Sequence, residues 1–175
     1  KCGTTMLHHW LKQNSQINMP KLKETHFFNY YFSNGKDWYK NQFNENDNLL
    51  NGEVDPSYLF VPESSSNIKK CIDKLKFIII VRKPIERAYS HYLMSKYRLY
   101  EELTFDEALI EENDRIFKNK FSFYNFSYLK RSNYCDQIMR YQKLFPDSNF
   151  FFIKFDELID INNQKELYNN ICDYL

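Results

Sequence analysis

Hydrophobic residues in this 175-residue chain recur with two different spacings, and each spacing predicts a different kind of element. Between Met6 and Leu11 the apolar residues lie at helical spacing, which predicts a helix near 4–14. The continuous apolar run from Phe77 to Val81 predicts a parallel strand at 77–82 that is covered on both faces. The same two patterns predict helices at 85–100, 104–112 and near 127–145, a strand at 149–155 and a terminal helix.

Polar positions predict the connections between these elements. An extended segment is expected near 22–28, followed by a turn-rich aromatic region to about residue 60. The Asn-rich run 41–52 and the serines 64–66 are interpreted as loops, as is the stretch before the helix near 127. Because strands alternate with helices, the predicted fold is α/β, a three-layer sandwich with a mainly parallel central sheet.

The composition narrows the classes of function. With 43% hydrophobic residues and 21.5 kDa, residues 1–175 are expected to form a single domain with its own core. A net charge of +1 gives no basis for a nucleic-acid-binding surface. No apolar stretch is long enough to span a membrane. No metal is expected, because the cysteines lack C-x-x-C spacing (Cys2, Cys71, Cys135 and Cys172).

The first candidate for anion binding is the opening segment Lys1-Cys2-Gly3-Thr4-Thr5. Gly3 lets the backbone approach a ligand closely, and the N-terminus of the following helix offers unpaired N–H groups. Thr4 and Thr5 add hydroxyl donors, and Lys1 adds a full charge. Lys1 precedes the glycine, unlike the lysine of a Walker A loop, so nucleotide hydrolysis is disfavoured. A plain turn before a helix is the alternative interpretation.

The second candidate follows the strand predicted at 77–82. Arg82 lies at the carboxyl end of that strand, where open α/β sheets bind ligands, and Ser90 follows eight residues later on the next helix. Pro84 suits the first turn of that helix. Its buried stripe is predicted to contain Ala88, Tyr89, Tyr92 and Leu93.

These two segments, in this order, resemble the phosphate-binding sites of sulfotransferases that use 3′-phosphoadenosine 5′-phosphosulfate (PAPS). The run Lys23-Glu24-Thr25-His26-Phe27-Phe28 and the later Gly35-x-x-Trp38-Tyr39 resemble signatures of the heparan-sulfate sulfotransferase group and its bacterial relatives. The block Gly52-Glu53-Val54-Asp55-Pro56 and the order of the elements after residue 127 are also similar. The resemblance spans nearly the whole chain and implies a P-loop-like α/β fold.

The resemblance implies a transfer of the sulfuryl group from PAPS to a hydroxyl or amine acceptor, in particular of a carbohydrate. Glu24 would be the general base, and Lys1 would assist departure of the leaving phosphate. The other implied donor-binding residues are Cys2, Gly3, Thr4 and Thr5 at the phosphosulfate, Arg82 and Ser90 at the 3′-phosphate, and Lys130, Arg131 and Tyr134 in a loop over the nucleotide.

Several alternatives stay open. His26 is a rival base, because an extended segment would point it to the same face as Glu24. Glu24 could instead form an ordinary salt bridge, for example to Arg87. Val54 stands where many relatives carry a lysine, which puts a heparan-like acceptor in doubt. There are two alternative functions. The chain could be a catalytically degenerate relative that binds nucleotide or glycan, or it could be a P-loop kinase.

The sequence is expected to be truncated at both ends. Its last residues, Asp173-Tyr174-Leu175, resemble a helix cut short. Relatives carry a buried strand directly before the loop that contains Lys1, so the first strand is expected to precede residue 1. A membrane anchor upstream is compatible with this. The expected location is cytoplasmic for a bacterial protein, and the Golgi lumen for a eukaryotic one with an N-terminal anchor.

Overall fold

The structure, a computed structural model, describes residues 1–45, 48–146 and 148–175. The chain forms two compact units, which are described separately below. The sheet unit comprises residues 3–80 and 136–175, and the helical unit comprises residues 1–2 and 81–135. That the chain is a single domain stays a prediction.

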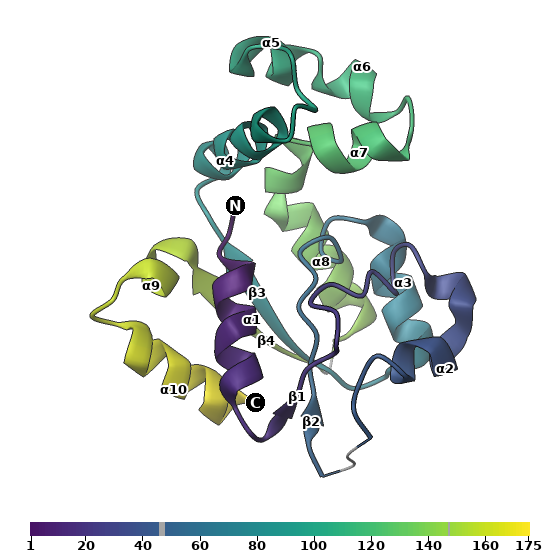
Figure 1. Cartoon of the computed structure of the whole chain (residues 1–175), viewed down its shortest axis with the longest axis vertical. Helices are drawn as coiled ribbons and strands as arrows, with labels where there is room; N and C mark the ends of the chain where they lie inside the picture. Colours follow the sequence, from purple (N-terminus) through teal and green to yellow (C-terminus); the bar gives the residue numbers. More distant parts are fainter. Residues whose placement is uncertain (46–47, 147) are drawn as a thin grey trace. The chain divides into compact units, whose positions relative to one another are not determined.

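Strands of the sheet unit lie in two pairs (Figure 1). β1 (Ile17–Asn18) runs parallel to β2 (Leu50–Asn51), with Ile17 opposite Leu50. The apolar strand β3 (Lys76–Val81), whose last residue belongs to the helical unit, is hydrogen-bonded to β4 (Asn149–Lys154). The strands predicted at 77–82 and 149–155 are therefore confirmed to within one residue, whereas the β1–β2 pair was not predicted.

Helices and an aromatic core complete the sheet unit. Phe27 and Phe28 are buried together with Ile68, Tyr141 and Phe145, and rings of the aromatic region before residue 60 pack against them. The helical elements of this unit are α1 (Thr4–Gln13), η1 (Phe32–Asn34), α2 (Gly35–Lys40), α3 (Pro62–Cys71), α8 (Tyr134–Leu144, whose first two residues lie in the helical unit), α9 (Phe155–Ile159) and α10 (Gln164–Tyr174).

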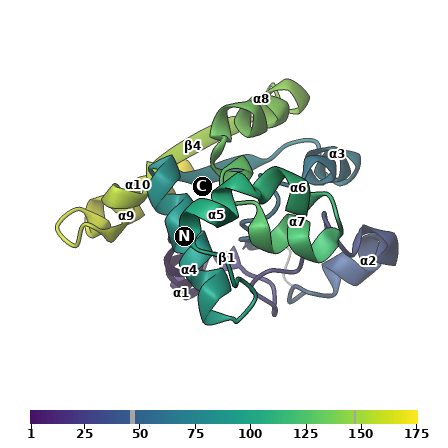
Figure 2. The same ribbon diagram turned by 90° about the horizontal axis from the view of Figure 1, so that it is seen from above.

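The helical unit has a smaller core around Tyr92 and Tyr128. Thr104 and Glu107 form a reciprocal capping box, which explains why a helix begins at residue 105. Figure 2 shows α6 and α7 side by side. The helices of this unit are α4 (Pro84–Tyr97), α5 (Phe105–Ile110), α6 (Glu112–Ile116), α7 (Lys120–Phe126) and η2 (Lys130–Ser132).

Serines 64–66, interpreted as a loop from the sequence, lie in helix α3. Ser65 and Ser66 donate hydrogen bonds from their hydroxyls to carbonyls one turn earlier, which satisfies them within the helix. Ser64 and Ser65 are buried beside the core residue Ile68. The loop prediction was wrong because tertiary packing outweighed the weak helix propensity of serine.

The region between residues 111 and 134 also differs from the prediction. The expected loop contains α6 and α7, and the long helix expected near 127 begins only at Tyr134. Asn119 caps α7 by accepting a hydrogen bond from the Ser122 N–H. The buried Glu112 carboxylate bonds to the backbone N–H groups of Leu129 and Lys130, which stabilises a turn there instead of a longer helix.

The buried face of α4 is turned relative to the predicted stripe. Ala88 and Tyr92 are buried as expected, but Tyr89 and Leu93 are 47% and 48% exposed. Arg87 and His91 are buried in their place. Apolar spacing was therefore right for Ala88 and Tyr92 and wrong for Tyr89 and Leu93, because Arg87 makes buried polar contacts on this helix. Among the described residues, no helix combines the length and the apolar character needed to cross a membrane.

Candidate active site

Gly3 gives the opening segment its shape. Its φ of +77° lies in the left-handed region, and its carbonyl accepts hydrogen bonds from the N–H groups of Met6 and Leu7 in the first turn of α1. A Cβ atom at this position would clash with the side chain of Leu158. Glycine is therefore required for both conformation and space, and the N–H groups at the start of α1 follow it directly. Thr4 and Thr5 open the helix, as predicted.

Four of the predicted donor-binding residues gather in the helical unit. The Arg82 guanidinium donates from Nη1 to the Lys1 carbonyl at 2.9 Å, and its backbone N–H donates to the Tyr134 hydroxyl at 3.4 Å. Cys2 Sγ lies 3.7 Å from the same hydroxyl. Burial raises the pKa of the Tyr134 phenol, so it keeps its proton at neutral pH. Three segments distant in sequence thus meet around Arg82.

Ser90 and Arg131 belong to the same unit as Arg82. Ser90 is half-buried on α4, on the helix that follows Arg82. Arg131 donates to the Tyr124 carbonyl and stacks over the Tyr124 ring, with its guanidinium carbon 5.7 Å from the ring centre. These contacts hold Arg131 against α7.

Arg87 and Glu112 hold the backbone of segment 128–132, which precedes Tyr134. The Arg87 guanidinium donates to the Tyr128 carbonyl and to the Ser132 hydroxyl, and it is buried. Glu112 accepts from two N–H groups of the same segment. The sequence left open a salt bridge between Glu24 and Arg87. The Arg87 guanidinium instead donates its hydrogen bonds to Tyr128 and Ser132 of this segment.

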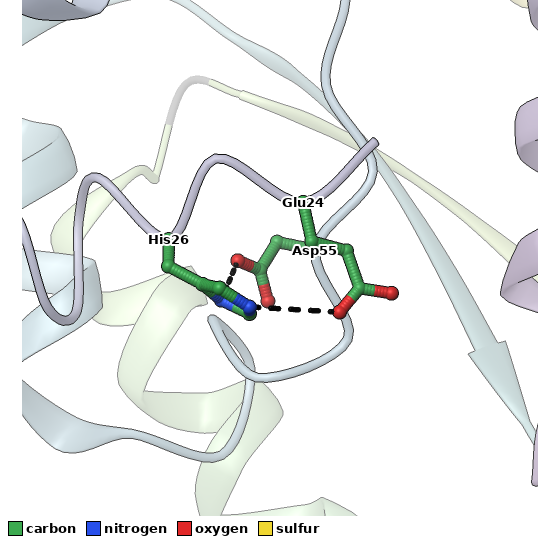
Figure 3. A group of neighbouring side chains, drawn as sticks. All are labelled: Glu24, His26 and Asp55. Atoms are coloured by element: carbon green, nitrogen blue, oxygen red, sulfur yellow. Dashed lines mark ion pairs between the residues drawn. The ribbon is translucent and has the colours of Figure 1, made fainter. Parts of the chain in front are cut away.

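The sheet unit contains the two candidate bases, Glu24 and His26. They lie in a segment of bends and turns rather than in the extended segment predicted near 22–28. Even so, Glu24 Oε2 and His26 Nε2 are only 3.8 Å apart, and Figure 3 shows the two side chains pointing toward one another. Lys23 forms an ion pair with Glu24 Oε1. Both candidate bases are partly exposed, with 30% and 32% of their side chains accessible.

Asp55 joins this pair and was given no role in the sequence analysis. Its side chain has no exposed surface, and its Oδ2 lies 2.7 Å from His26 Nδ1 (Figure 3). Pairing with Asp55 is the main cause that raises the pKa of His26 above its ordinary value, against the opposing effect of burial. The sequence feature that could have identified Asp55 is its place as an acidic residue in the family-like block at 52–56. The sequence alone does not show that this residue lies close to His26.

Glu53 anchors the segment that carries the candidate bases. Its buried carboxylate accepts hydrogen bonds from the Thr25 N–H and hydroxyl, at 3.0 and 2.5 Å, and from the hydroxyls of Tyr39 and Tyr58, both at 2.9 Å. Burial raises the pKa of Glu53, while these hydrogen bonds oppose the rise. Thr25 lies between Glu24 and His26, so Glu53 fixes the backbone from which both side chains project.

Glu24, His26 and Asp55 are also a group whose ligand atoms lie within 4.8 Å of one another, close enough to hold a metal ion. Each of them has a charged protein partner: Lys23 pairs with Glu24, and His26 pairs with Asp55. The three residues and Lys23 therefore form an ion-pair network. The expectation that no metal is needed stays a prediction.

Comparison with known proteins identifies similar sequences over the whole chain. The model of the sulfotransferase domain matches residues 1–175. The chain is 32% identical to the membrane-associated sulfotransferase kil1 of Dictyostelium discoideum over 126 residues, 66% of this chain and 27% of that protein. It is 27% identical to human heparan sulfate glucosamine 3-O-sulfotransferase 5 over 171 residues, 91% of this chain and 46% of that protein. The chain thus spans less than half the length of these relatives.

A solved structure is similar in fold. The crystal structure of a sulfotransferase from Alicyclobacillus acidocaldarius has a TM-score of 0.84 and is 26% identical, covering 99% of this chain and 76% of that one. This match confirms the α/β fold predicted from the sequence.

Proposed function

The chain belongs to the sulfotransferase family. From this premise we propose that it transfers a sulfuryl group from PAPS to a hydroxyl or amine of a carbohydrate acceptor. The observation that carries the proposal is the meeting of Lys1, Cys2, Arg82 and Tyr134, which come from three segments of the chain. An arginine at the carboxyl end of a β-strand and a helix that begins at a glycine are each features that suit phosphate binding.

The donor would be held by charge and by backbone N–H groups. The start of α1, with Gly3, Thr4 and Thr5, supplies donors for the phosphosulfate. Arg82 supplies a guanidinium for the 3′-phosphate, with Ser90 on the following helix as a second ligand. Arg131 and Tyr134 belong to the segment proposed to contact the nucleotide.

Glu24 would act as the general base. As the acceptor oxygen or nitrogen forms its bond to sulfur, Glu24 takes the acceptor proton, and the bridging S–O bond breaks with its electron pair remaining on the nucleotide phosphate. Lys1 would stabilise the negative charge that develops on that bridging oxygen. The ion pair with Lys23 occupies Glu24 Oε1, which leaves Oε2 as the oxygen available for the proton.

The acceptor class rests on the relatives. One of them is named for sulfation of glucosamine in heparan sulfate, which supports a carbohydrate. Val54, at the position where many relatives carry lysine, is buried and apolar. This difference supports an acceptor less anionic than heparan sulfate, because one cation for a polyanion is missing.

Calorimetric titration with adenosine 3′,5′-bisphosphate tests the donor site, with AMP as the control ligand. We expect binding that requires the 3′-phosphate. Equal affinity for AMP would refute the assignment of the 3′-phosphate site. Transfer from radiolabelled PAPS to a panel of oligosaccharides, phenols and amines then tests the reaction. Normal donor binding without transfer to any acceptor would favour a degenerate binding protein.

A further inference from the structure

Asp55 is held in one position by two different contacts. Its Oδ1 accepts a hydrogen bond from the Ser57 N–H at 2.8 Å, within a turn in which the Asp55 carbonyl accepts from the Tyr58 N–H. Its Oδ2 faces His26 Nδ1 at 2.7 Å. A carboxylate without exposed surface is costly unless it is paired, so His26 is the cation or donor that offsets the burial of Asp55.

His26 is held equally firmly. Its φ of +53° is in the left-handed region, which is uncommon for a residue other than glycine. The His26 carbonyl accepts hydrogen bonds from the N–H groups of Tyr30 and Tyr31, and the Tyr30 ring packs edge-on against the imidazole. Backbone strain of this kind persists where the surrounding contacts enforce it. The contacts therefore fix the direction of the imidazole.

This orientation determines which ring nitrogen of His26 carries the hydrogen and which one can accept a proton. The 2.7 Å contact of Nδ1 with Asp55 is a close ion pair without hydrogen-bond geometry. The negative charge of Asp55 favours the neutral form of His26 that carries its hydrogen on Nδ1. Nε2 then carries the lone pair, and Glu24 Oε2 lies 3.8 Å from it. The three side chains form a compact group in which one ligand atom of each lies within 4.8 Å of the others, and the imidazole faces both carboxylates (Figure 3).

We propose that Asp55 is a positioning residue for sulfuryl transfer, which holds His26 so that Nε2 can take the proton that Glu24 removes from the acceptor. The proton leaves the acceptor hydroxyl or amine for Glu24, and then passes to His26 Nε2. Glu24 returns to its carboxylate form, and the imidazolium is neutralised by Asp55. This inference rests on the proposed function, because it assigns a role within that reaction.

The charges around His26 set the pH dependence. Asp55, Glu24 and Glu53 all favour the imidazolium, whereas burial disfavours it. Lys23 forms an ion pair with Glu24, and His8 of α1 interacts electrostatically with both of these residues. Since His26 must be neutral to accept a proton, transfer should become faster as the pH rises through its pKa. Removing the charge of Asp55 should lower that pKa and move the rise to lower pH.

The first test is nitrogen NMR of histidine-labelled protein, with the His26 signal assigned through its loss in His26→Asn. In the unmodified protein we expect the Nδ1–H form at high pH and a pKa above about 6.5. Asp55→Asn should lower this pKa, and the exposed, ion-paired Asp73→Asn should leave it unchanged. Finding the Nε2–H form in the unmodified protein would overturn the inference. Because this result is measured on the unmodified protein, it does not depend on whether a variant folds.

The second test is the pH profile of turnover from radiolabelled PAPS, to the oligosaccharide panel or to water. Asp55→Asn should reduce kcat about tenfold or more, because part of a general-base contribution is lost, and should shift the rise to lower pH. Affinity for adenosine 3′,5′-bisphosphate should stay unchanged. An unaltered profile and rate with normal nucleotide binding would overturn the role of Asp55 alone. Absence of nucleotide binding in the unmodified protein would overturn the proposed function and this role with it.

Discussion

In the helical unit, the buried charges of Arg87 and Glu112 bond to backbone groups, whereas in the sheet unit the candidate bases bond to other side chains. Arg87 and Glu112 contact carbonyl and N–H groups of segment 128–132 and thereby fix its path. Glu24 and His26 instead depend on ion pairs, and about a third of each side chain is exposed. The first arrangement shapes a binding surface, and the second controls where protons lie.

This difference predicts different consequences of mutation. Losing a charge that holds backbone should reduce folding stability, because buried carbonyl and N–H groups lose their partners. Losing a charge in the ion-pair network should change rate and pH dependence, while the backbone stays fixed by Glu53. Four substitutions test the contrast, from the largest expected effect to the smallest.

Glu24→Gln should reduce kcat by about 100- to 10,000-fold, the range for a general base, and should leave the affinity for adenosine 3′,5′-bisphosphate unchanged. Single-turnover transfer from radiolabelled PAPS measures the chemical step. The exposed Glu166→Gln on α10 is the matched control. A rate within a few-fold of the unmodified protein would show that Glu24 is not the base.

Arg87→Met should lower the free energy of unfolding by about 3 kcal/mol, because the substitution leaves the Tyr128 carbonyl and the Ser132 hydroxyl without a charged donor. Urea denaturation followed by circular dichroism measures it. Arg98→Met, at the exposed end of α4, is the control. An unfolding midpoint equal to that of the control would refute the view that Arg87 maintains this segment.

Arg82→Ala should weaken binding of adenosine 3′,5′-bisphosphate about tenfold to a hundredfold, the scale of a lost charged hydrogen bond. Stability should change less than in Arg87→Met, because Arg82 is partly exposed and its partners include the exposed Glu86. Calorimetry at two salt concentrations measures the affinity. Unchanged binding would remove Arg82 from the donor site.

His26→Asn should alter the pH dependence of stability by the smallest amount, since the ring is partly exposed. The pKa of His26 is raised in the folded protein, so its pairing with Asp55 stabilises fully below about pH 6.5 and is lost as the pH rises through the raised pKa. The stability difference between unmodified protein and variant should therefore shrink as the pH rises above about 6.5. Asparagine tolerates the left-handed backbone of this position. A difference that is constant with pH would argue against the ion pair.

Much of the framework followed from local pattern. The apolar run 77–81 had to be a strand, because its β-branched residues suit a sheet buried on both faces. Proline in the first turn of α4 and the glycine before α1 set where these helices begin. The family-like motifs also drew attention to Lys1, Glu24, His26 and Arg82. These features depend on residues adjacent in the chain, so the sequence alone determined them.

The tertiary structure decided which polar groups meet. Asp55 becomes the partner of His26, and Glu53 the anchor of Thr25, only because a later turn folds against the segment that carries the candidate bases. Arg87 replaces an apolar neighbour on the buried face of α4 for the same reason. Periodicity reports only whether a position is apolar. Pairing between buried charges depends on distances between residues far apart in the chain, which the fold sets.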